Sequence, residues 1–352
     1  MPIVSSTAKK SKQLLGYYHP KTWKEKGLIW TIGLFLATYV IVVLLLWFYW
    51  SSEPDMFDVN ANVVNTAKEQ KVKIVYGYTT TTTLSTLIET LLEKPGGYIS
   101  NDISPPGVFM DNIPEWEFGV LVQIRDMLVV MRNDFSRSQS QSIEDKDLII
   151  AQPQFHYDSE SWILPSTEGE YRKGLKALQR YIKRLSNPKK KEAQFYSRAD
   201  NLATYLDQVS KRLGSLSQRL SASVGQERIN TDLAGDNQAK QSTPADSEML
   251  VKTPWMQIDN IFYEARGESW ALVHLLKAIE TDFADVLRKK NALVSLRQII
   301  RELEGTQQTV WSPMILNGKG FGIVTNHSVI MSSYMSRANS QILDLIRLLQ
   351  QG

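Results

Sequence analysis

The sequence contains no cysteine, which excludes disulfide bonds, thiolate nucleophiles and thiolate metal sites. Histidine is scarce, and no two histidines have the four-residue spacing with which a helix binds zinc. The four stand far apart in the chain, at His19, His156, His274 and His327. We therefore predict no metal site and no cofactor. His274 adjoins the apolar face of a predicted helix, which favours a hydrogen-bonded core side chain over a ligand.

Several catalytic motifs are also missing. There is no Gly-x-Ser-x-Gly elbow, and the glycine-rich loop at 317–322 lacks the Gly-Lys-Ser/Thr ending of a phosphate-binding loop, so we interpret it as a flexible turn. Ser186 and Lys189 have the Ser-x-x-Lys spacing of penicillin-binding enzymes. Pro188 lies between them at a predicted helix end, however, and that chemistry needs the lysine one helical turn beyond the serine.

Charge is absent from residue 27 to residue 52, and Leu28–Trp50 within this run is strongly apolar. A helix rises about 1.5 Å per residue and the hydrocarbon core is about 30 Å thick, so about 20 apolar residues can cross it. We predict a membrane-spanning helix over 27–51. Aromatic side chains near its two ends are suited to the membrane interfaces, namely Trp30, Trp47, Tyr49 and Trp50.

The charges that flank this run predict its orientation. Lysines precede it and acids follow it, so the basic tail 1–26 is expected in the cytoplasm and the body 52–352 outside it. The lysines could also contact anionic lipid. A cleaved signal peptide is the alternative, but its apolar region would span about 7–15 residues and end in small residues. The aromatic residues at 47–50 favour an uncleaved signal anchor.

The remaining composition excludes one class of partner. The first 50 residues hold six lysines and one glutamate, so the rest of the chain carries −2 of the whole-chain formal charge of +3. A nearly neutral body without a basic stripe is not expected to bind nucleic acid. The body is long enough for one or two domains with a substantial core. A large exported body without cysteine favours a bacterial periplasm.

Apolar residues at helical spacing predict a mainly α body with little β. The predicted helical ranges are 84–92, 115–135, 171–185, 195–220, 255–304 and 326–349. A short strand is predicted over Val72–Tyr78. The threonines Thr79–Thr83 are interpreted as a β-branched lead-in, or as a segment whose Thr83 hydroxyl caps the next helix. The polar stretch at about 221–250 is predicted to be a flexible insertion.

The segment Tyr98–Phe118, which is rich in turn residues up to Pro114, is the first candidate for a binding site. Aromatic and acidic side chains mix there, as they do in protein interfaces, although the aromatics could equally pack inward. The candidate partner-binding residues are Tyr98, Asp102, Phe109, Asp111 and Trp116. The competing enzyme hypothesis pairs two carboxylates for glycoside or peptide cleavage. Its candidates are Asp102, Asp111, Glu115, Glu117 and Asp126, which could instead accept backbone hydrogen bonds or pair with Arg125 and Arg132.

Longer phrases distributed over the chain resemble a proteobacterial single-span membrane family, the domain of unknown function numbered 2333. They lie at 94–102, 111–119, 135–142, 198–202, 212–217 and 326–328. The resemblance implies a bacterial inner-membrane protein with a periplasmic body, and it supplies no catalytic residue. Residues 225–250 match no such phrase and are interpreted as a local insertion.

Two functions therefore stay open. The first is a non-enzymatic scaffold that contacts the bilayer and an envelope protein partner. The second is an envelope hydrolase acting on glycan or peptide through carboxylates within 102–126. The small residues Gly33 and Ala37 in the span also have the spacing of a helix-pairing motif.

Overall fold

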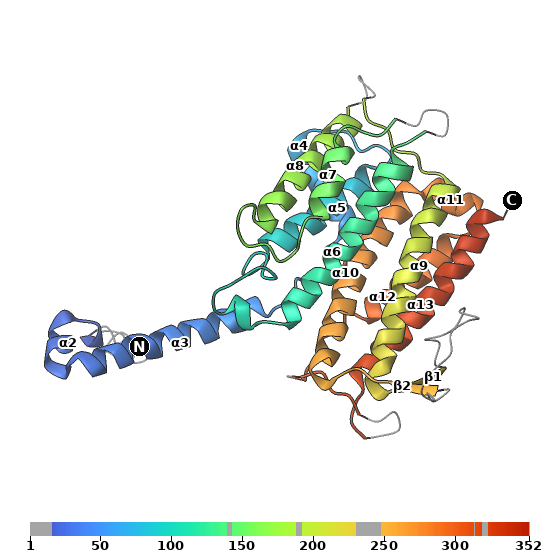
Figure 1. Ribbon diagram of the computed structural model, residues 1–352. Coiled ribbons are helices and arrows are strands. Elements are labelled where there is room, and N and C mark those ends of the chain that lie inside the picture. The colour runs from blue at the N-terminus through green and yellow to red at the C-terminus, as the bar shows by residue number, and fades with distance from the viewer. Residues whose placement is uncertain are drawn as a thin grey trace, which may run out of the picture.

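A computed structural model describes residues 16–138, 143–187, 192–229, 248–312, 314–318 and 323–351. One apolar helix, α3, projects as a rod from a body of packed helices (Figure 1). The prediction of a mainly α chain with little β is confirmed. Parts of the basic tail, the insertion and the glycine-rich loop fall outside the described residues, at 1–15, 230–247 and 319–322.

The rod begins with a short helical hairpin. Helix α2 (Pro20–Lys26) turns at Gly27, whose φ of 87° suits glycine, and packs back on α3 (Leu28–Trp50). The ring of Trp23 lies 5.3 Å from that of Phe35. In the described chain, α3 is the one helix long and apolar enough to cross a membrane, and none of its most apolar window is buried in the protein.

The body consists of ten further α-helices among the described residues. They are α4 (Val59–Gln70), α5 (Tyr78–Glu93), α6 (Asn112–Val130), α7 (Leu148–Phe155), α8 (Thr167–Leu185), α9 (Ala199–Ser221), α10 (Ile258–Asp282), α11 (Ala284–Lys289), α12 (Leu293–Gly305) and α13 (His327–Gln350). Helix α6 runs into a π-turn over Met131–Phe135. Short 3-10 turns occur at Gly107–Phe109, Ala222–Val224 and Trp255–Gln257.

Helix α10 is the central element. It packs along α6 and also contacts α5 and α12, while α9 packs along α13 (Figure 1). Two glycines allow α6 and α10 to approach closely. A Cβ at Gly119 would lie 2.1 Å from the Glu264 carbonyl oxygen, and one at Gly267 would lie 2.0 Å from that of Trp116. One continuous apolar core therefore joins the helices of the body.

The predicted strand at Val72–Tyr78 is wrong, because no neighbouring strand pairs with it and α5 already begins at Tyr78. Thr79–Thr83 belong to the buried first turns of α5, so neither interpretation of this run is correct. Asp282 of α10 accepts from the Thr80 amide and hydroxyl at 2.6 and 2.8 Å. The Thr81 hydroxyl donates to the Gly77 carbonyl at 2.7 Å. These bonds satisfy β-branched polar residues within a helix.

The predicted insertion at 221–250 is structured where its two ends meet. Strands β1 (Gln226–Ile229) and β2 (Glu248–Val251) pair antiparallel, with Gln226 opposite Val251. Both strands are mostly exposed, so backbone pairing rather than apolar burial holds them. An argument from apolar content alone could not detect this pairing.

Candidate functional site

The C-terminal end of α3 is fixed to the body by a buried arginine. Arg266 of α10 donates to both carboxylate oxygens of Glu53, with its Nη2 2.6 Å from Oε2. Its Nη1 donates to the carbonyls of Thr306 and Gln308, both at 2.9 Å. A planar guanidinium with all these donors engaged holds the segment just after α3 in one position on the body.

A second contact reinforces this junction. The amide of Phe57 donates to Nε2 of His274 at 3.1 Å, and the two rings stack with centroids 3.9 Å apart. Burial lowers the pKa of His274 to about 4, so its ring is neutral at pH 7. Since Nε2 accepts, Nδ1 carries the proton and donates to the Trp270 carbonyl at 2.7 Å. The prediction of a hydrogen-bonded core histidine is confirmed.

The candidate binding loop divides into buried and exposed residues. Tyr98 is buried and donates to the Ser159 carbonyl at 3.0 Å, and Trp116 is buried against Trp270 with rings 5.2 Å apart. Both aromatics therefore pack inward. Asp111 is exposed and accepts from the Asn112 amide at the start of α6. Asp102 is half-buried, and Phe109 lies at the surface.

A buried ion pair between Lys94 and Glu117 shapes this loop. Lys94 Nζ lies 2.6 Å from Glu117 Oε1 and also donates to the Gly97 carbonyl at 2.7 Å. Glu117 accepts from the amides of Ile99 and Ser100 at 2.8 and 2.9 Å. Burial raises the pKa of Glu117, and Lys94 and the amide donors oppose that shift. Every oxygen has a structural partner, so this carboxylate organises the loop.

An open groove of about 620 Å³ lies between α6, α9 and α10. Phe118, which is 39% exposed, and the half-buried Val129 give it apolar surface. Ion pairs line it. Arg212 donates to both oxygens of Asp126 at 2.8 and 3.1 Å, and Arg219 pairs with Glu264. An apolar surface edged by charges of both signs is typical of a protein-binding surface.

One acid in this groove is unusual. Glu268 is buried and accepts from Gln123 Nε2 at 3.0 Å. Burial, and secondarily the charge of Glu264, raises the pKa of Glu268 to about 8, so it is mostly protonated at pH 7. A proton donor therefore shares one groove with two carboxyl groups that are paired with arginines, those of Asp126 and Glu264.

Sequence reasoning found Asp126 but missed its groove partners Arg212, Arg219, Glu264 and Glu268. They come from helices that are distant in the sequence. One local signal was available, since Glu264 and Glu268 are like charges one helical turn apart, an arrangement that is unfavourable unless one is paired or protonated.

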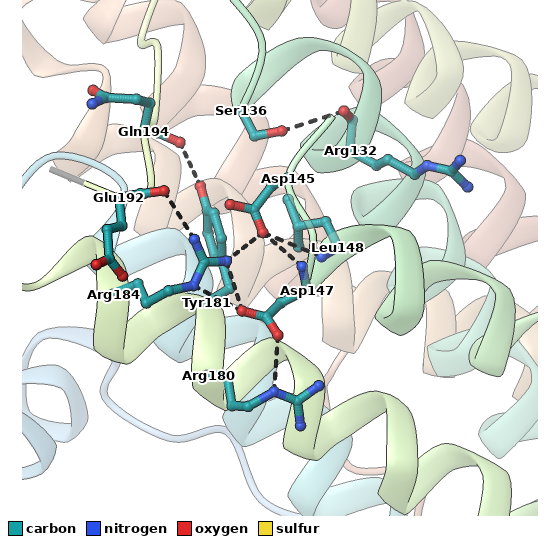
Figure 2. Close-up of polar contacts among 10 residues, drawn as sticks. All are labelled: Arg132, Ser136, Asp145, Asp147, Leu148, Arg180, Tyr181, Arg184, Glu192 and Gln194. Carbon is teal, nitrogen blue, oxygen red and sulfur yellow. Dashed lines mark hydrogen bonds and ion pairs between the residues drawn. The ribbon is translucent and has the colours of Figure 1, made fainter. Parts of the chain in front are cut away.

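A second polar cluster lies elsewhere in the body, where α8 meets the chain that leads into α7. Figure 2 shows the Arg184 guanidinium between Asp145 and Asp147, with Arg180 also bound to Asp147. Burial alone would raise the pKa of Asp147, but hydrogen bonds from Arg180 and Arg184 outweigh it and leave this pKa below its usual value. Arg184 also donates to the Glu192 carbonyl at 2.9 Å. This cluster therefore joins α8 to the segment that precedes α7.

Neither cluster resembles a metal centre. Within the described ranges, no three His, Asp or Glu side chains are grouped so that they could hold a metal ion. His327 accepts from the Leu316 amide through Nδ1 at 2.9 Å, next to the cap residue Asn326, and thus closes the loop before α13.

The fold and these sites define a helical-bundle protein with one N-terminal apolar helix that is a candidate membrane anchor or signal sequence. The chain belongs to the family described as uncharacterized protein conserved in bacteria (DUF2333), whose model matches residues 23–352. Comparisons with curated proteins and with solved structures found no match.

Proposed function

We propose that this protein is a membrane-anchored, non-enzymatic binding protein of the bacterial cell envelope, with its N-terminus in the cytoplasm and its body in the periplasm. The apolar rod, the lysines before it and the acids after it support this topology. Membership of a bacterial family over residues 23–352 agrees with it.

The junction between rod and body is the observation that carries the proposal. Arg266 binds Glu53 and two backbone carbonyls, and His274 binds Phe57. A flexible tether would suffice merely to keep an enzyme near the membrane. A rigid mount presents a surface at a fixed height and angle, as a scaffold requires.

The groove between α6, α9 and α10 is the surface we assign to the partner. Its place between three helices, its partly exposed Phe118 and its charged edges suit an amphipathic helix of another envelope protein. The apolar face of that helix would cover Phe118 and Val129. Its flanking charges would meet Lys211, Asp126 and Arg212.

Photo-crosslinking in intact cells tests the groove. A photoreactive residue at Gln208, which lines the groove, should give a discrete crosslinked band, and Phe118→Asp should remove it without lowering the melting temperature of the purified chain. The matched control places the same residue at exposed Val294 of α12, outside the groove, where no band is expected. A band that persists in Phe118→Asp would refute this assignment.

A second candidate function rests on Glu268. The protonated acid Glu268 and the arginine-paired carboxyl groups of Glu264 and Asp126 lie in one groove, and glycoside cleavage uses a pair of such groups. If the full-length protein in detergent releases soluble fragments from purified cell wall, and Glu268→Gln abolishes that release, the hydrolase replaces the scaffold. The scaffold hypothesis expects no release from either protein.

A further inference from the structure

We propose that the loop at 102–110 is a second membrane contact, which inserts its apolar side chains into the outer interface of the bilayer beside the exit of α3. The inference rests on the proposed membrane anchorage. It adds a lipid-binding surface to the body itself.

The loop lies beside the end of α3. The ring of Trp50, the last residue of α3, packs against the small apolar cluster of Ile99, Met110 and Ile113. Its indole also lies so close to Gly96 that a Cβ there would be 2.8 Å away. The loop between α5 and α6 lies beside the end of the rod (Figure 1). If Trp50 lies at the membrane interface, this loop must lie at nearly the same depth.

The side chains of the loop suit that depth. Ile103, Val108 and Phe109 are 60%, 49% and 70% exposed, although each is a large apolar residue. Such a group is unfavourable in water but favourable at the boundary between headgroups and hydrocarbon. The protein itself leaves these three side chains uncovered.

The backbone of the loop also suits an environment poor in water. The amides of Val108, Phe109 and Met110 donate to carbonyls within the loop at 3.2, 3.0 and 2.9 Å. The neighbouring Pro105 and Pro106 have no amide hydrogen to satisfy. Local hydrogen bonds thus reduce the cost of moving this turn out of water.

Charge identifies the kind of lipid contact. The sequence has no lysine or arginine from residue 95 to residue 124, and it has Asp102 and Asp111 at the two ends of the turn. Attraction to anionic headgroups is therefore not the driving force. The loop therefore contacts the apolar boundary of the bilayer in this proposal, and vesicles of purely zwitterionic lipid should support its insertion.

The absence of cysteine makes a clean test possible. Single cysteines introduced by Phe109→Cys, Val294→Cys and Phe48→Cys carry a nitroxide label in the full-length chain, reconstituted in zwitterionic vesicles. Val294 is 77% exposed in the first turn of α12, just after α11. Helix α11 lies at the end of the body far from α3 (Figure 1). Phe48 is 86% exposed on α3 and reports on the span.

Accessibility to oxygen and to a water-soluble nickel reagent gives the readout. We expect the labels at 48 and 109 to favour oxygen and the label at 294 to favour nickel. If the label at 109 is as accessible to nickel as the label at 294, while the label at 48 stays in lipid, only this inference is overturned. A label at 48 that is open to nickel overturns the membrane anchorage as well. Spin broadening at 109 that disappears on dilution with unlabelled chain would assign the loop to a second copy instead.

Discussion

Glu268 is a buried acid whose proton links stability to pH. Its folded-state pKa of about 8 lies above its value in the unfolded chain, so its contribution to stability is complete below about pH 4 and is lost as pH rises towards 8. Gln123 can still donate to an amide oxygen at this position. Glu268→Gln should therefore be more stable than the parent by a few kcal/mol at pH 8, with little difference at pH 4.

Chemical denaturation at several pH values checks this expectation. Equal stability curves for the parent and Glu268→Gln from pH 4 to pH 8 would show that the groove does not hold a protonated acid.

Arg184 forms ion pairs with two aspartates, Asp145 and Asp147. Its removal would leave Asp145 and Asp147, which are almost inaccessible to solvent, without a major partner. We expect Arg184→Ala to lower the free energy of unfolding by roughly 3 kcal/mol. Because the pKa of Asp147 is depressed, the parent should also lose this contribution as pH falls below about 4, whereas the variant should not.

Arg347→Ala is the matched control, since its ion pair with Asp344 is largely exposed. Its cost should stay within about 1 kcal/mol. Similar losses for the two variants in a denaturant titration would contradict a structural role for the buried cluster.

At the scale of elements, the contact between α6 and α10 depends on two glycines. Gly119→Ala would place a methyl group 2.1 Å from a backbone carbonyl oxygen of α10, and neither helix backbone can yield easily. We expect this substitution to lower stability by at least about 2 kcal/mol. Gly214→Ala in α9 is the control, because its Cβ would meet only ordinary contact at 3.4 Å.

In that control the gain in helix propensity should leave stability unchanged or raise it by up to about 1 kcal/mol. Thermal melting of the two variants compares their stabilities with that of the parent. A Gly119→Ala protein as stable as Gly214→Ala would mean that the helices do not cross so closely.

Some elements could be predicted from the sequence and others could not, for identifiable reasons. Helices such as α8 and α9 carry apolar residues at regular helical spacing, so their existence was predictable, although their first residues were displaced by about one turn. The first turns of α5, which begins at Tyr78, contain Thr79–Thr83, where no apolar period exists. These turns depend on Asp282, which is about 200 residues away. Local patterns cannot supply such a contact.

The candidate site illustrates the same limit. The aromatic character of the Tyr98–Phe118 segment was visible, but which rings face inward depends on α10, because Trp270 covers Trp116. The groove needed three helices to be placed together before Arg212 could meet Asp126. Its partner role and that of the loop at 102–110 stay proposals.

At the scale of the whole molecule, we propose a helical body mounted on one membrane helix. The junction at Arg266 links residues 213 positions apart, so the orientation of the rod is part of the fold. In the proposed arrangement one face of the body would lie towards the bilayer, with the groove of α6, α9 and α10 at a fixed distance from it.

The most direct test of the membrane anchorage is a fusion of a reporter phosphatase to the C-terminus. The phosphatase folds only in an oxidising compartment. The mass of the mature protein is measured in the same cells. We predict an active reporter on a chain that retains residues 1–50. Two results would contradict the anchored periplasmic body. One is an inactive phosphatase in cells where a second reporter, active only in the cytosol, is active when fused at the same position. The other is a mature chain that lacks its first fifty residues.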